Sequence, residues 1–300
     1  MKKTLLSHSS STESADSASF TALRQQIEQR GEVEDASVSE LLKLFDQLTE
    51  FELGRFLLIN KGLNAFWTNE LVTWTAENPR ALTPLEETIF TRLPATLATR
   101  ERYIIFRQQL QNLVSDGAVF ASVPCGVMSD LLNLSGLEKM RLVGIDLDEG
   151  ALEAARTLAE QRGVAAQTEL VHCDAWQLTF SNAFDVLTSN GLNIYQRSDE
   201  KVTELYALFH QALKKGGTLV TSFLTPPPLL APDSSWRMAL LDPALLRLQK
   251  LLFMSVIGTA WNAMRTEQQT RQQLTQAGFH NIRVIYDRAG LFPTVLAEKG

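Results

Sequence analysis

The chain has 300 residues, of which 45% are hydrophobic and 21% are charged, and its formal net charge is −6. This composition is typical of a globular protein with a hydrophobic core, and the acidic balance argues against a broad basic surface that binds nucleic acid. The longest apolar run, at residues 251–261, is shorter than the roughly 18 residues that a membrane-spanning helix needs, so we expect no membrane span.

Cysteine content and the first residues bear on the cellular compartment. The two cysteines, Cys125 and Cys173, are too few for a disulfide scaffold and have no CxxC spacing. They favour a reducing compartment and argue against a metal site. The initial sequence, MKKTLLSHSS, lacks the apolar core of a secretory signal peptide. We therefore expect a cytoplasmic protein without a bound metal.

The first third of the chain is predicted to be helical after a disordered tail. Residues 1–19 are rich in serine and poor in large apolar side chains. Within residues 20–115, Ser37–Glu40 and Thr83–Glu86 have the spacing of helix N-terminal caps, and apolar residues then recur at helical intervals. We interpret residues 20–115 as a helical N-terminal region on the substrate side of the domain that follows.

From residue 116 onward, predicted strands alternate with predicted helices. Five apolar segments that end in polar turns are expected to be strands, at residues 118–123, 141–146, 169–173, 184–189 and 218–223. Two further strands, 281–286 and 293–298, follow a helical insertion at residues 226–265. This alternation favours an α/β fold with a doubly wound, mainly parallel sheet, in a Rossmann-like domain at residues 116–300.

Six segments of this domain follow one another in a recognisable order. They are GAVFASVPCG, LVGIDLD, ELVHCDAWQL, FDVLTSNGLNIY, LKKGGTLVTSF and LTQAGFHNIRVIYD. Together they resemble the motifs of the class I S-adenosylmethionine-dependent methyltransferases. The resemblance implies a seven-stranded sheet that ends in an antiparallel hairpin, with S-adenosyl-L-methionine as cofactor and S-adenosyl-L-homocysteine as product.

The resemblance also assigns roles to residues at the ends of the expected strands. Asp146, about 20 residues after the first turn, would bind the ribose hydroxyls, with Leu147 beside the adenine. Asp174 would accept a hydrogen bond from the adenine amino group, and Ala175 or Trp176 would pack against the ring. The residues assigned to the methionine part and to the methyl side are Val123, Pro124, Cys125, Gly126, Asn190 and Gly191.

The first motif departs from the family pattern. Where the family commonly has an acidic residue and three alternating glycines, this chain has Ser122, Pro124, Gly126 and Met128. Glycine lets the backbone approach a ligand closely, and proline lacks an N–H donor. Two readings stay open, a methyltransferase that acts on an unidentified small molecule and a non-catalytic, methyltransferase-like binding or scaffold protein. An NAD(P) oxidoreductase would need a G-x-G-x-x-G turn, which the sequence lacks.

Candidate substrate residues lie outside the cofactor motifs. Tyr195 is placed to orient or deprotonate a nucleophile, or to pack under the following helix. The residues that would reach the cofactor carboxylate or an acidic substrate are Arg100, Arg102, Tyr103 and Arg107, whereas the simpler interpretation is a solvated helix face. Trp236 and Trp261 would line an apolar substrate pocket, pack in a core or form a subunit interface. A homo-oligomer through the N-terminal helices or the insertion is left open.

Overall fold

The computed structural model describes residues 13–75, 77 and 80–300, which form two compact units. Of these residues, the first unit comprises those up to Leu97 together with Ala239–Ala260, and the second comprises Ala98–Met238 and Trp261–Gly300. The first unit thus joins the N-terminal helices to part of the segment after the fifth strand. The sequence-based boundary between residues 115 and 116 stays a prediction.

The first unit is helical. Its elements are α1 (Glu13–Arg30), α2 (Val38–Thr49), α3 (Glu52–Asn60), α4 (Ala65–Thr73), α5 (Pro84–Thr91), α10 (Pro243–Lys250) and the π-helix η5 (Leu251–Ile257), with the 3-10 turn η4 (Met238–Leu240) leading into α10. Both predicted caps are confirmed. The Ser37 hydroxyl accepts a hydrogen bond from the Glu40 amide, and Thr83 forms a complete capping box with Glu86.

Helix α1 begins within the segment that was expected to be a disordered tail. Residues 1–12 lie outside the described residues, but residues 13–19 are helical. The helix packs on α2, where the rings of Phe20 and Phe45 meet edge-on with 6.4 Å between their centres. Ile27 of the same helix is 4% exposed. This packing stabilises a helix whose serine-rich first turns have little apolar surface of their own.

The segment after the fifth strand packs on the N-terminal helices within the first unit. Arg247 of α10 forms an ion pair with Glu40 of α2 (2.7 Å), and the Ala260 amide donates to the Lys61 carbonyl (2.8 Å). The π-helix η5 contacts both α2 and α3. The insertion predicted to be helical at residues 226–265 is helical only within 238–257, because three consecutive prolines at 226–228 hold its first part in non-helical backbone.

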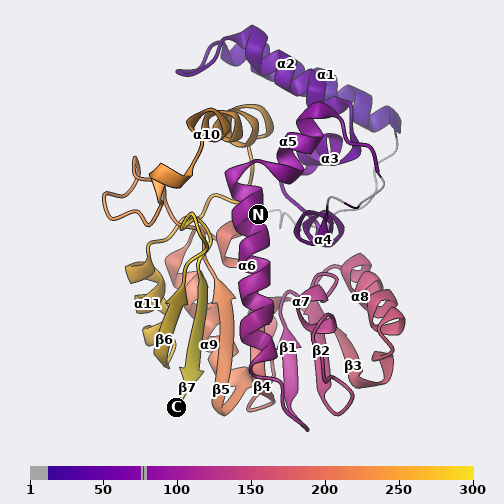
Figure 1. Ribbon diagram of the computed structural model, residues 1–300, viewed down its shortest axis with the longest axis vertical. Helices are drawn as coiled ribbons and strands as arrows, with labels where there is room; N and C mark the ends of the chain where they lie inside the picture. The colour runs from indigo at the N-terminus through magenta and orange to yellow at the C-terminus, as the bar shows by residue number, and fades with distance from the viewer. Residues whose placement is uncertain (1–12, 76, 78–79) are drawn as a thin grey trace. The chain divides into compact units, whose positions relative to one another are not determined.

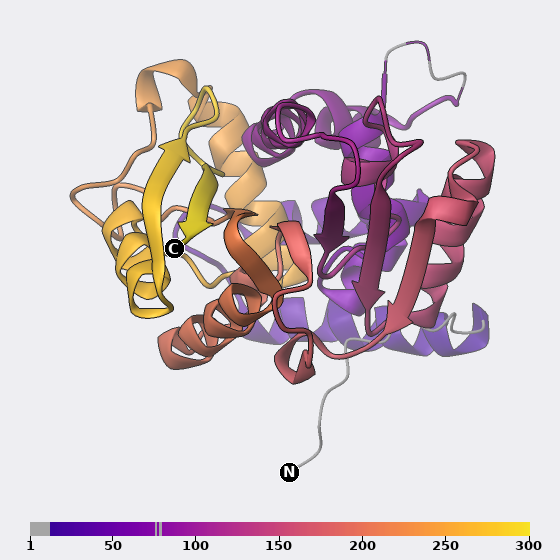
Figure 2. The same cartoon turned by 90° about the horizontal axis from the view of Figure 1, so that it is seen from below.

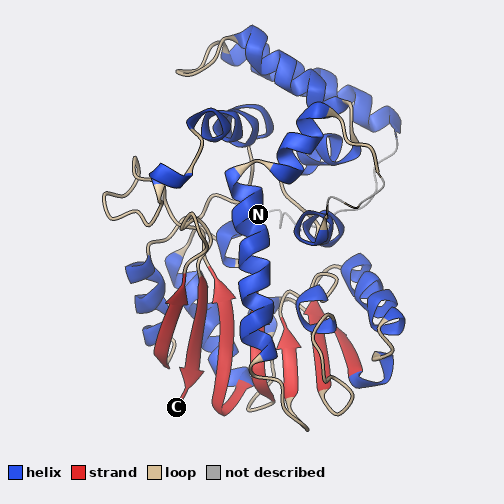
Figure 3. Cartoon of the chain, in the orientation of Figure 1, coloured by secondary structure: helices blue, strands red, loops and turns tan. Residues whose placement is uncertain are grey.

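The second unit contains a seven-stranded sheet, labelled in Figure 1 and red in Figure 3. Its strands are β1 (Val119–Ser122), β2 (Arg141–Asp146), β3 (Thr168–His172), β4 (Phe184–Ser189), β5 (Leu213–Ser222), β6 (Phe279–Ile285) and β7 (Thr294–Lys299), in the order β3-β2-β1-β4-β5-β7-β6. β1 to β5 are parallel, and β7 is antiparallel to β5 and β6. The α/β class and the mainly parallel seven-stranded sheet are confirmed. β5 begins before residue 218, because Leu213 already pairs with Phe184.

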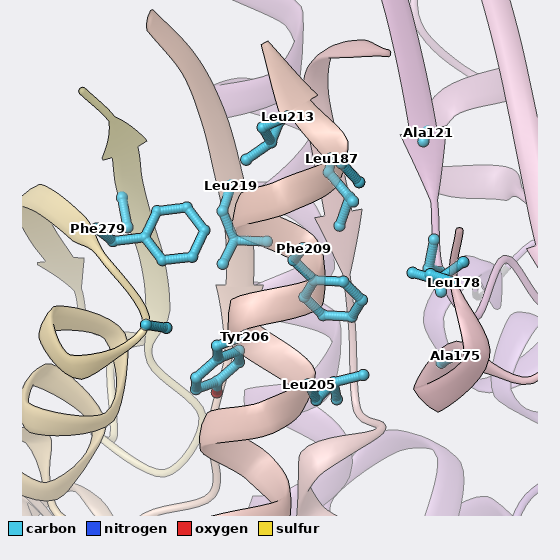
Figure 4. Packing of buried hydrophobic residues seen from close by; sticks show 14 of the residues in the cluster. Ala121, Ala175, Leu178, Leu187, Leu205, Tyr206, Phe209, Leu213, Leu219 and Phe279 are labelled. Carbon is cyan, nitrogen blue, oxygen red and sulfur yellow. The ribbon is translucent and has the colours of Figure 1, made fainter. Parts of the chain in front are cut away.

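Helices cover both faces of this sheet, which Figure 2 shows from below. On one face lie α6 (Pro94–Gln111), α7 (Ser129–Leu132) and α8 (Glu149–Gln161), which contribute Phe106, Leu131 and Leu152 to a buried cluster. On the other face lie α9 (Asp199–Ala212) and α11 (Glu267–Gln276). The 3-10 turns η1 (Ala165–Gln167), η2 (Ala175–Gln177) and η3 (Asn193–Tyr195) connect strands and helices. In Figure 4, Phe209 of α9 lies between the sheet residues Leu187 and Leu219 and its helix neighbour Leu205.

Replacing Phe209 with alanine is expected to lower the free energy of unfolding of the sheet unit by about 3–5 kcal/mol, because the side chain is fully buried and leaves a cavity. Urea unfolding followed by circular dichroism measures the loss. Leu230→Ala serves as the control, because Leu230 is 67% exposed, and its effect should stay within about 0.5 kcal/mol. A loss for Phe209→Ala as small as that of the control would contradict this description of the core.

Candidate functional site

The carboxyl ends of the parallel strands meet at one edge of the sheet and bring the predicted cofactor residues together. In the strand register, Ser122 at the end of β1 lies beside Gly144 of β2 and Thr188 of β4. Asp146 at the end of β2 lies beside His172 of β3. The turns that follow these strands carry residues 123–126, 146–147, 174–175 and 190–191. This is the edge at which doubly wound sheets bind ligands; the binding roles themselves stay predictions.

The turn after β1 is fixed to the strands on both of its sides. The Val123 amide donates to the Thr188 carbonyl of β4, and the Cys125 amide donates to the Ile145 carbonyl of β2, each at 2.9 Å. The Val123–Pro124 peptide is cis, and Gly126 has a φ of 53°. Val123 and Cys125 are buried, whereas Pro124 and Gly126 are half-buried. The turn therefore presents Pro124 and Gly126 to the edge of the sheet and holds its other two residues in the core.

Asp146 holds this turn through its carboxylate. Oδ2 accepts a hydrogen bond from the Gly126 amide (2.8 Å), and Oδ1 accepts one from the Asp148 amide (3.0 Å). Burial raises the pKa of Asp146, against the lowering effect of these two hydrogen bonds. Each oxygen keeps a further lone pair for a ligand hydroxyl. The adjacent Leu147 is 47% exposed and offers an apolar surface beside this carboxylate.

Asp174 caps the 3-10 turn η2 in this structure. Its Oδ1 accepts from the Trp176 amide (2.9 Å), and its Oδ2 accepts from the Gln177 side chain (3.3 Å). Ala175 is buried in the core beside α9, and the Trp176 indole donates to the Lys201 carbonyl (3.0 Å). A cap and an acceptor for a ligand amino group are compatible, because a carboxylate accepts about four hydrogen bonds.

The loop after β4 is held by buried polar groups. Asn190 accepts from the Ser222 hydroxyl (3.0 Å), and Asn193 donates to the Tyr206 hydroxyl (2.8 Å) and the Ser222 carbonyl (2.7 Å). Arg265, which is 2% exposed, donates to the carbonyls of Asn193 and Gln196. Gly191 has a φ of +87°, and a Cβ at this position would meet no atom within 4 Å. The loop thus presents an open backbone position at its glycine.

Arg102, one of the arginines predicted to reach the cofactor carboxylate or an acidic substrate, is buried near Tyr195 and does not lie on a solvated helix face. It stacks on the Phe292 ring at 4.9 Å, and burial lowers its pKa to about 10, partly opposed by the charges of Asp287 and Tyr195. Its Nε and Nη1 atoms are buried and have no hydrogen-bond acceptor among the described residues. The half-buried Tyr195 therefore lies within electrostatic range of a guanidinium group.

Two of the predicted substrate residues, Tyr103 and Trp236, form hydrogen bonds within the chain. The Tyr103 hydroxyl donates to the Ser129 carbonyl and accepts from the Asn133 side chain, both at 3.1 Å, so it positions α7. The Trp236 indole donates to the Thr225 hydroxyl (2.9 Å). Arg100 and Trp261 are half-buried, and burial lowers the pKa of Arg100. A role of these four residues in substrate binding stays a prediction.

Asp130, at the start of α7, is a site residue that sequence reasoning missed. Its carboxylate accepts hydrogen bonds from the hydroxyls of Ser122 (3.3 Å) and Thr188 (3.1 Å), which end β1 and β4. The residue is 8% exposed, and burial raises its pKa to about 6. The available signal was a single acidic residue inside the apolar stretch VMSDLL. Burial, followed by the charges of Asp146 and Asp130, raises the pKa of the Cys125 thiol, which disfavours thiol chemistry.

Other features of the described residues lie apart from this edge. A cavity of about 600 Å³ lies between the loop at residues 225–235 and α11, and no predicted cofactor residue lines it. No group of three or more His, Cys, Asp or Glu side chains among the described residues is arranged to hold a metal ion. In the same part of the chain, none of the helices has the length and apolar character needed to cross a membrane. A cytoplasmic location stays a prediction.

Comparison with known proteins relates this edge to methyl transfer. Residues 121–217, from β1 into β5, match a family described as methyltransferase domain. Demethylmenaquinone methyltransferase from Bacteroides fragilis is 27% identical over 122 residues, which are 40% of this chain and 44% of that protein. The chain thus matches less than half the length of this curated relative.

Solved structures extend the likeness over the remaining chain. A possible exported protein from Bordetella parapertussis is 50% identical, with a TM-score of 0.91 and coverage of 97% of this chain and 99% of that chain. Magnesium protoporphyrin IX methyltransferase from Synechocystis PCC 6803, solved with bound SAH, is 15% identical over 78% of this chain and 94% of that chain, with a TM-score of 0.53. This second likeness concerns the fold alone.

Asp130 is expected to make the unfolding free energy depend on pH. Its folded pKa of about 6 lies above the ordinary value of 3.8, so its contribution to stability is fully present below pH 4 and is lost as the pH rises through 6. The difference between the two values corresponds to at most about 3 kcal/mol. Asp130→Asn should therefore gain stability relative to the wild type as the pH rises from 4 to 7.

Urea unfolding of both proteins across this pH range tests the expectation. The control is Asp116→Asn, because the Asp116 side chain is 72% exposed, and its curve should run parallel to the wild-type curve. A constant difference between Asp130→Asn and the wild type from pH 4 to pH 7 would show that Asp130 titrates as an ordinary carboxylate.

Proposed function

Because the chain belongs to the class I S-adenosylmethionine-dependent methyltransferase superfamily, we propose that it transfers a methyl group from S-adenosyl-L-methionine to a small-molecule acceptor. The observation that carries the proposal is the Asp146 carboxylate at the end of β2, oriented by the amides of Gly126 and Asp148. A carboxylate held in this way, with free lone pairs at a sheet edge, suits the two hydroxyls of a ribose.

The neighbouring residues suit the remaining parts of the cofactor. The exposed Leu147 side chain offers an apolar contact for the adenine, and Asp174 retains acceptor positions for its amino group. Pro124 and Gly126 form the half-buried surface of the turn beneath the methionine part. At Gly191 the open space above the backbone leaves room for the reacting end of the ligands.

Methyl transfer depends more on the alignment of the donor and the acceptor than on acid–base groups of the protein. When bound, the cofactor supplies a methyl group that its sulfonium centre already activates. The chain then has to hold an acceptor in line at the loop after β4, and hydrogen bonds of Arg265 and Asn193 hold this loop in place. Tyr195, in the same loop and near the charge of Arg102, is our candidate for orienting the acceptor. The acidic net charge of the chain supports a small molecule over a nucleic acid as acceptor.

Asp146→Ala is expected to weaken the binding of S-adenosyl-L-methionine by more than tenfold, which is about 1.4 kcal/mol or more. The loss has two causes, since the variant removes the acceptor for the ribose hydroxyls and releases the Gly126 amide. Isothermal titration calorimetry measures both affinities. Asp116→Asn, at the opposite edge of the sheet, is the charge-matched control and should bind as the wild type does.

Two results would count against the proposal. An affinity for Asp146→Ala equal to that of the wild type would exclude the ribose role of Asp146. A wild-type protein that gives no heat and no thermal shift with millimolar S-adenosyl-L-methionine would favour the non-catalytic binding or scaffold protein, which the altered residues at positions 122, 124 and 128 leave open.

A further inference from the structure

We propose that the cavity of about 600 Å³ between the loop at residues 225–235 and α11 is a second ligand site, which takes an uncharged, hydroxyl-rich molecule of the saccharide class. The residues that line the cavity all belong to the second unit, and none of them is assigned to the cofactor. Its volume lies within the range of about 300–1,000 Å³ that is usual for small-molecule sites. The inference goes beyond the proposed function and does not depend on it.

One wall of the cavity is a loop that its own hydroxyl groups fix in place. Thr225 donates to the Gly290 carbonyl (2.8 Å), and Ser235 donates to the same carbonyl (2.7 Å). Ser234 donates to the Pro226 carbonyl within the loop (2.7 Å). Gly290 lies in the turn between β6 and β7, so the loop is tied to the sheet. This wall therefore holds its shape through hydrogen bonds within the chain, and its hydroxyl oxygens remain acceptors.

The opposite wall is α11, which packs on β6 (Figure 1), and its charged groups are already paired. Arg271 forms an ion pair with Glu267 (2.6 Å) and donates to the Ile282 carbonyl (2.6 Å). The Tyr286 hydroxyl donates to the same carboxylate. Burial alone would raise the pKa of Glu267, but the hydroxyl of Tyr286 and then Arg271 lower it below its ordinary value. The guanidinium group is thus committed to Glu267 and is not a free receptor for a phosphate or a carboxylate.

Five further polar side chains line the cavity and have no hydrogen-bond partner among the described residues. They are those of Asp233, Gln268, Gln272, Thr275 and Gln276. The four on α11 are exposed and recur at helical intervals, whereas Leu274 of the same helix is buried in the core. Carboxamides and hydroxyls each donate and accept hydrogen bonds. They match ligand groups that do the same, and the hydroxyls of a saccharide are such groups.

The same inventory disfavours other classes of ligand. An anion would meet the carboxylates of Asp233 and Glu267, with Arg271 as the only cation that lines the cavity within the described residues. A cation would find an acceptor in Asp233 but would leave the carboxamide N–H groups without one, and an apolar ligand would desolvate the polar walls. A saccharide offers hydroxyl pairs to the carboxylate and the carboxamides, and its C–H face packs on an aromatic ring, which Tyr286 supplies. The competing explanation is a groove that holds only solvent.

Saturation-transfer NMR on the full chain, with maltose, lactose and sucrose as probes at millimolar concentration, tests the proposal. At least one of the three is expected to bind the wild type, with the strongest transfer to the C–H protons that face the ring. Gln272→Ala should weaken this binding about tenfold, because it removes one free carboxamide, and alanine suits an exposed helix position. The matched control is Gln161→Ala at the exposed end of α8, which should bind within about twofold of the wild type.

Two further measurements separate the ring and the cofactor from this effect. Tyr286→Phe keeps the aromatic ring and should retain saccharide binding, whereas Tyr286→Leu should lose it. Calorimetric titration with S-adenosyl-L-methionine should give the same affinity for Gln272→Ala and the wild type within about twofold, because no predicted cofactor residue lines the cavity.

Each other outcome has a definite meaning. If none of the three disaccharides binds the wild type, the cavity holds only solvent and the inference is overturned, and this comparison needs no variant. A disaccharide that binds Gln272→Ala as tightly as the wild type binds elsewhere, which also overturns it. Binding of inorganic pyrophosphate or spermidine that Gln272→Ala weakens, without binding of any disaccharide, would show that the class of ligand is wrong. None of these results bears on the binding of S-adenosyl-L-methionine, so the proposed function stands or fails separately.

Discussion

The hydrogen bond from the Gly126 amide to the Asp146 carboxylate (2.8 Å) joins the turn after β1 to the end of β2, and the geometry of the site depends on it. Two further amides of the turn, at Val123 and Cys125, bond the carbonyls of β4 and β2. Pro124 has no amide N–H, but the amides of Val123, Cys125 and Gly126 on either side of it all donate hydrogen bonds within the chain. The altered motif therefore costs one possible ligand contact and leaves the turn tied to both neighbouring strands.

The sheet and its ligand edge could be predicted because their signals are local. Each parallel strand is a short apolar run that ends in a polar turn, and parallel strands place those turns at one edge. The resemblance to the methyltransferase family assigned roles to Asp146 and Asp174, and in the structure Asp146 ends β2 and Asp174 follows β3. The signals for helix caps are also local, because a capping residue and its partner are three positions apart. The hydroxyls of Ser37 and Thr83 accept hydrogen bonds from the amides of Glu40 and Glu86, as this spacing predicted.

What could not be predicted depends on contacts between distant parts of the chain. Asp130 becomes a buried carboxylate only when the hydroxyls of β1 and β4 converge on it, and Thr188 is 58 residues away. In the same way, α10 joins the N-terminal helices through Arg247 and Glu40, which are 207 residues apart. Helix α1 extends into the serine-rich start because it packs on α2. No local pattern encodes these partners.

The two carboxylates beside the turn argue for a ligand of particular charge. Burial raises the pKa of both Asp146 and Asp130, and neither forms an ion pair with a cationic side chain of the described residues. A turn that served only to connect β1 to α7 would be more stable with neutral side chains at both positions. Uncompensated negative charge at the crevice of a doubly wound sheet lowers stability but favours a cation. A cofactor with an ammonium group and a sulfonium centre matches that charge, whereas the anionic pyrophosphate of a nicotinamide dinucleotide opposes it.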